Sequence, residues 1–192
     1  MKKFLFTILS IFVMVCSVNA QIKEEIQKSR ERSEKLQLLC NDYKKSGNSN
    51  IDGYGEAVKN AAVLAIANSA QLEDMYKRQI GETKDGVTDV TITKPSLEEW
   101  ATFATTVAGE AVSIKTATDK LKAAADEAKT ISESATKEKN PMKAAKAVKT
   151  AKAATAVMEF GNVATPILLE ESAAQVKAVN TIIETLKSGK NL

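Results

Sequence analysis

The sequence contains no histidine, and only 2 of its 192 residues are cysteines. A di-iron bundle takes a Glu-x-x-His pair from each of two helices, and a zinc site takes histidines or several cysteines. A serine triad also lacks its usual base, and no glycine-rich stretch has the spacing of a phosphate-binding loop. We therefore expect a protein that is not an enzyme and has no catalytic residue, metal site or cofactor.

Pairs of adjacent glutamates are the remaining candidates for acid–base chemistry. Such pairs include Glu98 with Glu99 and Glu170 with Glu171. Residues adjacent in sequence point to different sides of a helix, so the two carboxylates of such a pair do not face one substrate. We interpret Glu170 and Glu171 as surface charges.

Aromatic residues and proline are scarce, at 5% of the chain and 3 residues. Alanine dominates the apolar residues instead and favours helix over sheet at nearly every position. We predict an all-α fold, an elongated four-helix bundle built on a long antiparallel helical hairpin. A short extended segment is expected between its second and third helices.

The first 20 residues have the order of a secretory signal peptide. Lys2 and Lys3 precede an apolar stretch at residues 4–15, and small residues lead to Ala20. This pattern predicts export to the periplasm, the cell envelope or the outside of a bacterium, with cleavage after Ala20 and one domain at residues 21–192. Without Lys2 and Lys3 the formal net charge falls from +3 to +1, which predicts no attraction to nucleic acid or anionic membrane through bulk charge.

The two cysteines have different expected fates. A lipoprotein cut before a lipid-modified Cys16 is an alternative to the signal peptide, but Val15 stands where that pattern requires a small residue. If Cys16 leaves with the signal, no intramolecular disulfide can form and core packing alone holds the fold. Cys40 falls in line with apolar residues, and we interpret it as a small buried hydrophobe.

Four helices are predicted, at residues 21–45, 54–79, 96–136 and 141–187. A cluster of turn residues at 46–53 ends the first, and Ser96 with Glu99 three residues later has the spacing of a capping box. Asn140 followed by Pro141 marks the start of the last helix. The short connection at residues 137–140 predicts that the last two helices form the antiparallel hairpin.

Each predicted helix has an apolar seam with steps of three and four residues, which is typical of helices packed lengthwise. The predicted seams are Ile22, Ile26, Ser29, Ser33, Leu36, Cys40 and Tyr43; Val58, Ala62, Ala65, Ser69, Leu72 and Tyr76; Leu97, Trp100, Ala104, Val107, Ala111, Ile114, Thr118, Leu121, Ala125, Ala128, Ser132 and Ala135; and Ala144, Val148, Ala151, Thr155, Met158, Asn162, Thr165, Leu169, Ser172, Val176, Val179, Ile183 and Leu186. The last helix has a second stripe at Ala153, Val157, Phe160, Ala164, Ile167, Ala174 and Ala178. Pro166 within it predicts a kink near residues 161–162.

Residues 80–95 depart from the helical pattern. Glycine and proline interrupt them, and residues 87–93 are rich in β-branched side chains, which predicts a short extended segment or a hairpin turning at Asp85 and Gly86. A hairpin this short is marginal alone and needs a supporting surface. We rank Val87, Asp89, Val90 and Ile92 as the best candidate recognition surface, with an ordinary structured connection as the alternative.

Lys146, Lys149 and Lys152 recur at steps of three in an alanine-rich stretch of the last helix. They are a second candidate surface, for an acidic partner or for acidic lipid. Bulky apolar residues are missing from this stretch, so we favour a solvated lysine face over membrane contact.

No motif in the chain identifies a specific biochemical activity. We expect an exported, non-enzymatic helical bundle that acts through contacts with a protein partner or with further copies of itself, without nucleic acid. The alternatives are a membrane-active, pore-forming-like bundle and a carrier of a small apolar ligand in the bundle core. Seams already filled by alanine argue against the carrier.

Overall fold

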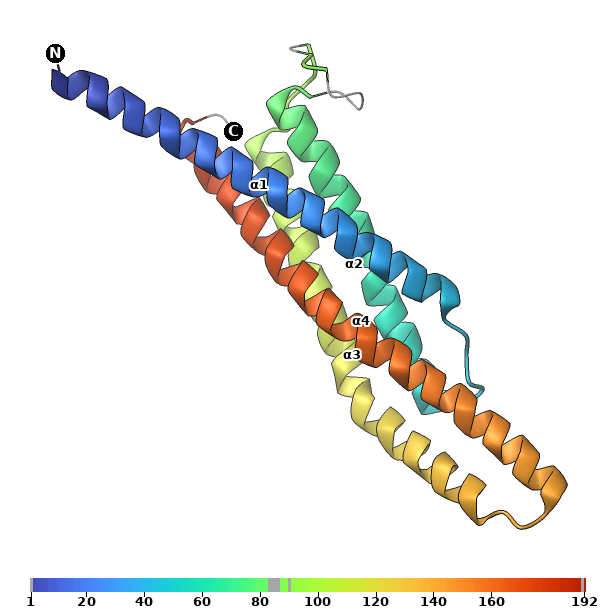
Figure 1. Ribbon diagram of the computed structural model, residues 1–192. Helices are drawn as coiled ribbons and strands as arrows, with labels where there is room; N and C mark the ends of the chain where they lie inside the picture. Colours follow the sequence, from blue (N-terminus) through green and yellow to red (C-terminus); the bar gives the residue numbers. More distant parts are fainter. Residues whose placement is uncertain (1, 83–86, 90, 191) are drawn as a thin grey trace.

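The computed structural model describes residues 2–82, 87–89, 91–190 and 192, and the side chains from Val18 onward. The chain forms four helices, α1 (Lys2–Asp42), α2 (Ser49–Ile80), α3 (Leu97–Lys137) and α4 (Pro141–Lys187). They run along one long axis (Figure 1). The predicted all-α bundle is confirmed, and the described residues include no strand.

The helices α2 and α4 form the centre of the bundle. They contact each other, and α1 and α3 each pack on both of them. Two parts project from this arrangement in Figure 1: the beginning of α1 at one end, and the turn between α3 and α4 at the other. The chain connects α3 to α4 through Glu138, Lys139 and Asn140.

Both predicted N-terminal caps are confirmed. The Ser96 hydroxyl accepts a hydrogen bond from the Glu99 amide, and the Glu99 carboxylate accepts one from the Ser96 amide. The Asn140 side chain accepts hydrogen bonds from the amides of Met142 and Lys143. Each cap satisfies amides at the start of a helix that have no partner within the helix.

One predicted helix boundary is wrong. The structure begins α2 at Ser49 although residues 46–53 were predicted to form a turn, and α1 includes the predicted signal segment from Lys2 onward. The Glu127 carboxylate of α3 accepts hydrogen bonds from the amides of Asn50 at 2.9 Å and Ile51 at 3.0 Å. An anionic acceptor at the first turn stabilises a helix start, so the helix extends through turn-forming residues.

The predicted seams of α1 and α2 are confirmed. Every member is buried except Tyr43, which is half-buried. Cys40 is a buried free thiol, as predicted. Burial raises the pKa of this thiol, although the charge of Lys59 acts in the opposite direction, so the thiol form is favoured.

The predicted seam of α3 is wrong at alternate positions. Ala111 and Thr118 are exposed, and the preceding residues Glu110 and Ala117 are buried in their place. The buried residues of α3 are Trp100, Phe103, Val107, Glu110, Ile114, Ala117 and Ala124. From Val107, a step of three leads to Glu110 and a step of four leads to Ala111. A search that avoids charged residues chooses Ala111, which is exposed.

In α4 the second predicted stripe lies nearer to the core than the main seam. Val148, Thr155, Asn162 and Leu169 of the main seam are exposed. The buried residues are Ala154, Val157, Phe160, Gly161, Ala164, Leu168, Glu171, Ser172, Gln175, Ala178, Val179 and Ile182. The helix runs without interruption from Pro141 to Lys187, with Pro166 at an exposed position.

The apolar core consists of two clusters. One is built around residues such as Leu36, Val58 and Leu168, and the other around Leu72 and Trp100. In every helix the residues of the two clusters occupy separate stretches of sequence. The residues between these stretches form the first candidate site.

Candidate functional site

A layer of buried polar side chains separates the two apolar clusters. We call it the polar layer, and it consists of Ser29, Arg32 and Ser33 of α1, Asn68 and Ser69 of α2, Glu110 of α3, and Glu171, Ser172 and Gln175 of α4. In each helix these positions fall between the residues that join the first cluster and those that join the second. All four helices therefore contribute polar groups at one level of the bundle.

Glu171 is the best-connected member of the polar layer, and its side chain is completely buried. One carboxylate oxygen accepts a hydrogen bond from Arg32 Nε at 2.5 Å. The other accepts from the Ser29 hydroxyl and from Gln175 Nε2, the latter at 2.6 Å. The buried carboxylate thus has both an opposite charge and hydrogen-bond donors, which is what burial of an ion requires.

Arg32 connects Glu171 to the surface of the bundle. Its guanidinium also pairs with Glu25 and, at 3.2 Å, with Glu170, whose side chain is 70% exposed. Burial acts to lower the pKa of Arg32, but hydrogen bonds to Glu171 and Glu25 outweigh it and raise the pKa. The prediction that both adjacent glutamates are surface charges is wrong for Glu171, and both carboxylates bind the guanidinium of Arg32.

Glu110 is a second carboxyl group in the polar layer. One of its oxygens accepts a hydrogen bond from Asn68 Nδ2 at 3.1 Å, and the other has no partner within the described part of the chain. Burial raises the pKa of Glu110 to about 7, against the effect of the Asn68 hydrogen bond and with a contribution from the charge of Glu171. Near neutral pH this carboxyl group is therefore divided between its protonated and ionised forms.

The polar layer contains the ion pair of Arg32 and Glu171 and a second buried carboxyl group, that of Glu110. Among the residues that the structure describes, no group of three or more histidine, cysteine, aspartate or glutamate residues is placed to hold a metal ion. Gln175 binds the α2 backbone as well, because its Nε2 donates to the Ala65 carbonyl at 3.1 Å. These bonds join α1, α2 and α4 at one level of the bundle.

The first predicted recognition surface lies near the end of α2. A single antiparallel bridge joins Glu82 to Thr88. The Asp89 amide donates a hydrogen bond to the Gly81 carbonyl at 2.6 Å. Residues 83–86, where the hairpin was predicted to turn, lie outside the described residues.

The candidate residues of this surface differ in exposure. Val87 is 62% exposed, Asp89 and Ile92 are half-buried, and Val90 lies outside the described residues. The Asp89 carboxylate accepts hydrogen bonds from the Thr91 hydroxyl and amide, which lower the pKa of Asp89. Asp89 therefore has a local role in holding this connection.

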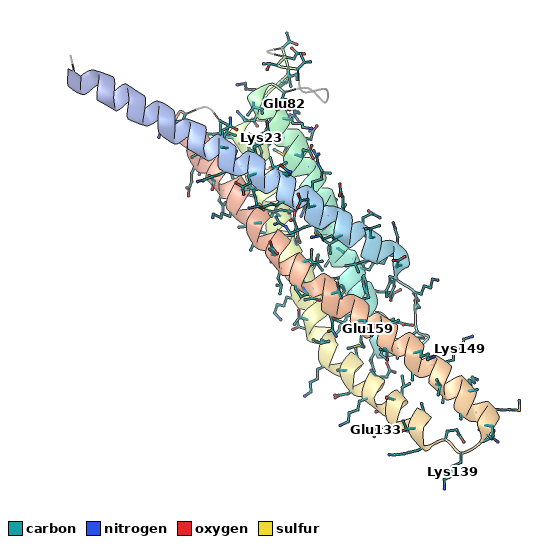
Figure 2. The ribbon with its side chains drawn as sticks, viewed as in Figure 1. Lys23, Glu82, Glu133, Lys139, Lys149 and Glu159 are labelled. Carbon is teal, nitrogen blue, oxygen red and sulfur yellow. The ribbon has the colours of Figure 1, made fainter. Side chains whose placement is uncertain are left out.

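The second predicted surface lies at the opposite end of the bundle. Lys146, Lys149 and Lys152 are all exposed. Three residues rotate a helix by about 300°, so the three positions turn around α4 rather than lying on one line. Figure 2 shows Lys149 on the side of α4 that faces away from α3, far from Glu82 near the other predicted surface.

Beyond the ends of α1 and α2, the helices α3 and α4 continue as a pair. The α2 helix starts beside Glu127, as the hydrogen bonds to Asn50 and Ile51 show. The α1 helix ends at Asp42, just before Tyr43, whose ring lies 4.9 Å from that of Phe160. We call residues 128–153 the distal end, which projects from the bundle in Figure 1.

The distal end has no buried residue. Its half-buried apolar residues are Ala128, Ile131, Ala135, Ala144, Ala147, Ala151 and Ala153, and all but Ala153 continue the spacing of the core. Met142 beside the turn is 86% exposed, and Val148 is 44% exposed. Ala128 and Ile131 pack against the first cluster, and beyond them the seam continues along α3 and α4 after α1 and α2 have ended.

No helix in the described part of the chain is long and apolar enough to cross a membrane. Comparison of the chain with protein-family models, with curated proteins and with solved structures found no match. The class that the fold defines is a helical bundle with a polar layer at its middle and an uncovered distal end.

Proposed function

We propose that this chain is an exported, non-enzymatic helical-bundle protein of the bacterial cell envelope that works through contacts with other proteins. The observation that carries the proposal is the distal end, where the apolar seam of α3 and α4 continues after α1 and α2 have ended. Covering apolar side chains is favourable by about 25 cal/mol per Å². A partner that covers this seam gains the stabilisation that α1 and α2 supply elsewhere.

In this proposal α3 and α4 act as one long antiparallel hairpin whose far end is presented to the partner. Hydrogen bonds and packing of α1 and α2 hold the base of the hairpin, and the Asn140 cap fixes the turn. A rigid, pre-formed surface loses little conformational entropy on binding. The segment that includes Val87 and Ile92 remains a second contact region, at the opposite end of the bundle.

A photo-reactive amino acid placed in the distal end tests the proposed contact. We expect a probe at Ala147 to cross-link to one or a few proteins in intact cells, identified by mass spectrometry. The matched control is Thr116, which is exposed on α3 inside the four-helix part of the bundle. Equal cross-linking at both positions, or none at Ala147, contradicts the proposal.

The export part of the proposal has its own test. Amino-terminal sequencing of the mature protein is expected to begin at Gln21, with the protein in the envelope fraction. Replacing Ala20 with a bulky residue is expected to block cleavage, because signal cleavage requires a small residue there. A mature chain that retains Met1, or that starts at a lipid-modified Cys16, contradicts this route.

A further inference from the structure

Positive charge is concentrated in the distal end. Residues 128–153 contain seven lysines and two glutamates, a net charge of +5, whereas the whole chain carries +3. The remainder of the chain therefore sums to −2. Among the seven lysines of the distal end, all of which lie in the described part of the chain, only Lys137 is within ion-pair distance of a carboxylate, at 3.9 Å from Glu133.

We infer that the distal end docks an acidic α-helix of a partner protein, laid along the seam of α3 and α4 where α1 and α2 no longer cover it. The inference rests on the proposed function, because it assumes that the chain works through protein contacts. It adds the secondary structure and the charge of the segment that binds.

The spacing of the seam is what selects a helix. The seam of the distal end continues the core with the same steps of three and four residues that α1 and α2 cover elsewhere in the bundle. It consists of Ala128, Ile131 and Ala135 on α3 and of Ala147 and Ala151 on α4. Small side chains allow a third helix to approach within the usual interaxial distance of about 8–10 Å. Each of α3 and α4 contributes about ten helical residues to the distal end, which is a length of about 15 Å. The contact is therefore short, and we expect a complex of moderate affinity.

Charge selects the acidic partner over a second copy of this chain. Two distal ends packed together would bring two sets of seven lysines into one interface, and like charges at an interface disfavour association. An acidic helix neutralises the same lysines and is steered to them by their field.

The seam also favours a helix over a lipid surface. Apart from Met142 and Val148, the exposed side chains of the distal end lack the bulky apolar groups that anchor a protein in a bilayer. Adsorption to lipid through the lysines would leave the half-buried alanines Ala135, Ala144, Ala147 and Ala151 of the seam as exposed as they are in the isolated chain.

Two labelled peptides of opposite charge test the inference against the full chain. Both are helical, with alanine and leucine at steps of three and four, and they carry glutamate or lysine at all other positions. We expect fluorescence anisotropy to show binding of the glutamate peptide, weakened by added salt, and no binding of the lysine peptide. Binding of neither peptide, or of both equally, overturns the inference.

Matched charge reversals locate the contact. The variant K143E/K146E/K149E is expected to bind the glutamate peptide at least about tenfold more weakly than the unmodified chain. The control K122E/K177E/K187E reverses the same number of exposed lysines outside the distal end and is expected to bind within about twofold. Equal losses in the two variants overturn the inference.

The seam and the lipid alternative need separate measurements. Ala147→Gln, with a circular dichroism spectrum that verifies the fold, is expected to weaken peptide binding severalfold because the longer side chain occupies the seam. Unchanged binding in this variant, or binding to phosphatidylglycerol vesicles without binding to the glutamate peptide, overturns the inference. If the Ala147 probe still cross-links to a protein while the glutamate peptide fails to bind, the acidic-helix inference fails and the proposed function stands.

Discussion

The polar layer and the distal end depart from an ordinary apolar core in opposite ways. In the polar layer, buried charges are tolerated because several helices surround them with partners. At the distal end, apolar side chains remain half-exposed because only two helices are present. Burial of a residue in this bundle therefore depends on how many helices reach its level, as well as on the residue's own polarity.

Removing the arginine of the polar layer is expected to have the largest effect on stability. Arg32→Met leaves the completely buried carboxylate of Glu171 without its opposite charge, and breaking a buried pair in this way typically costs about 3–5 kcal/mol. Urea unfolding followed by circular dichroism measures the free energy of unfolding.

The control for this change is the surface pair of Arg30 and Glu73, in which the arginine side chain is 56% exposed. Arg30→Met is expected to cost less than about 1 kcal/mol because water screens exposed pairs. Similar losses in the two variants would show that the polar layer is solvated, and the contrast with the distal end would fail.

The pH dependence of stability is expected to reveal the carboxyl group of Glu110. Its pKa in the folded protein is about 7 and exceeds the ordinary value of 4.5 for a glutamate, so between these pH values the folded state binds more protons than the unfolded state. Stability from this group is therefore complete below about pH 4.5 and is lost as the pH rises through about 7. A shift of this size corresponds to at most about 3 kcal/mol.

Glu110→Gln isolates this contribution, because glutamine does not titrate and can retain the contact with Asn68. We expect the free energy of unfolding of the unmodified chain, minus that of the variant, to fall between pH 5 and pH 8. Subtracting the free energy of unfolding of the variant removes the contribution of titrating groups that both proteins share. Glu73 is such a group: burial acts to raise its pKa, but hydrogen bonds and nearby positive charges lower it. A difference that does not change with pH would place Glu110 in contact with water.

Close contact between α2 and α4 marks the part of α4 that is covered. A Cβ atom built on Gly161 would lie 2.5 Å from Cζ of Tyr54, so Gly161→Ala is expected to destabilise the protein by about 1–2 kcal/mol, since overpacking outweighs the gain in helix propensity. Gly109→Ala is the control, because a Cβ atom there meets nothing within 4 Å. It is expected to stabilise the protein by up to about 1 kcal/mol. Thermal unfolding distinguishes the two signs, and stabilisation in both would show that α2 and α4 are not in close contact.

The seams of α1 and α2 could be predicted because their polar members are small. Ser29, Ser33 and Ser69 fit an apolar pattern without breaking it. In α3 and α4 the buried side of the helix includes Glu110, Glu171 and other polar residues. A search for apolar residues skips these positions and chooses exposed neighbours instead. Following the steps through Glu110 to Phe103 on one side and Ala117 on the other would have found the buried side of α3.

The distal end could not be recognised from the same pattern. Apolar residues recur at steps of three and four on both sides of Ala154, although Ala154 is buried and Ala147 is half-buried. The difference comes from where α1 and α2 end, and the start of α2 depends on Glu127, which is 77 residues away from Asn50 in sequence. A local pattern contains no information about so distant a cap.

The smallest expected effect compares two alanines on the same side of α4, two turns apart. Ala154→Ser places a hydroxyl group in the core and is expected to cost about 1 kcal/mol, because a buried polar group loses its bonds to water. Ala147→Ser in the distal end is expected to change the free energy of unfolding by less than about 0.5 kcal/mol, because water reaches the new hydroxyl. Equal losses would mean that the distal end is already covered in the isolated protein, and a dependence of the Ala147→Ser loss on protein concentration would identify a second copy as the cover.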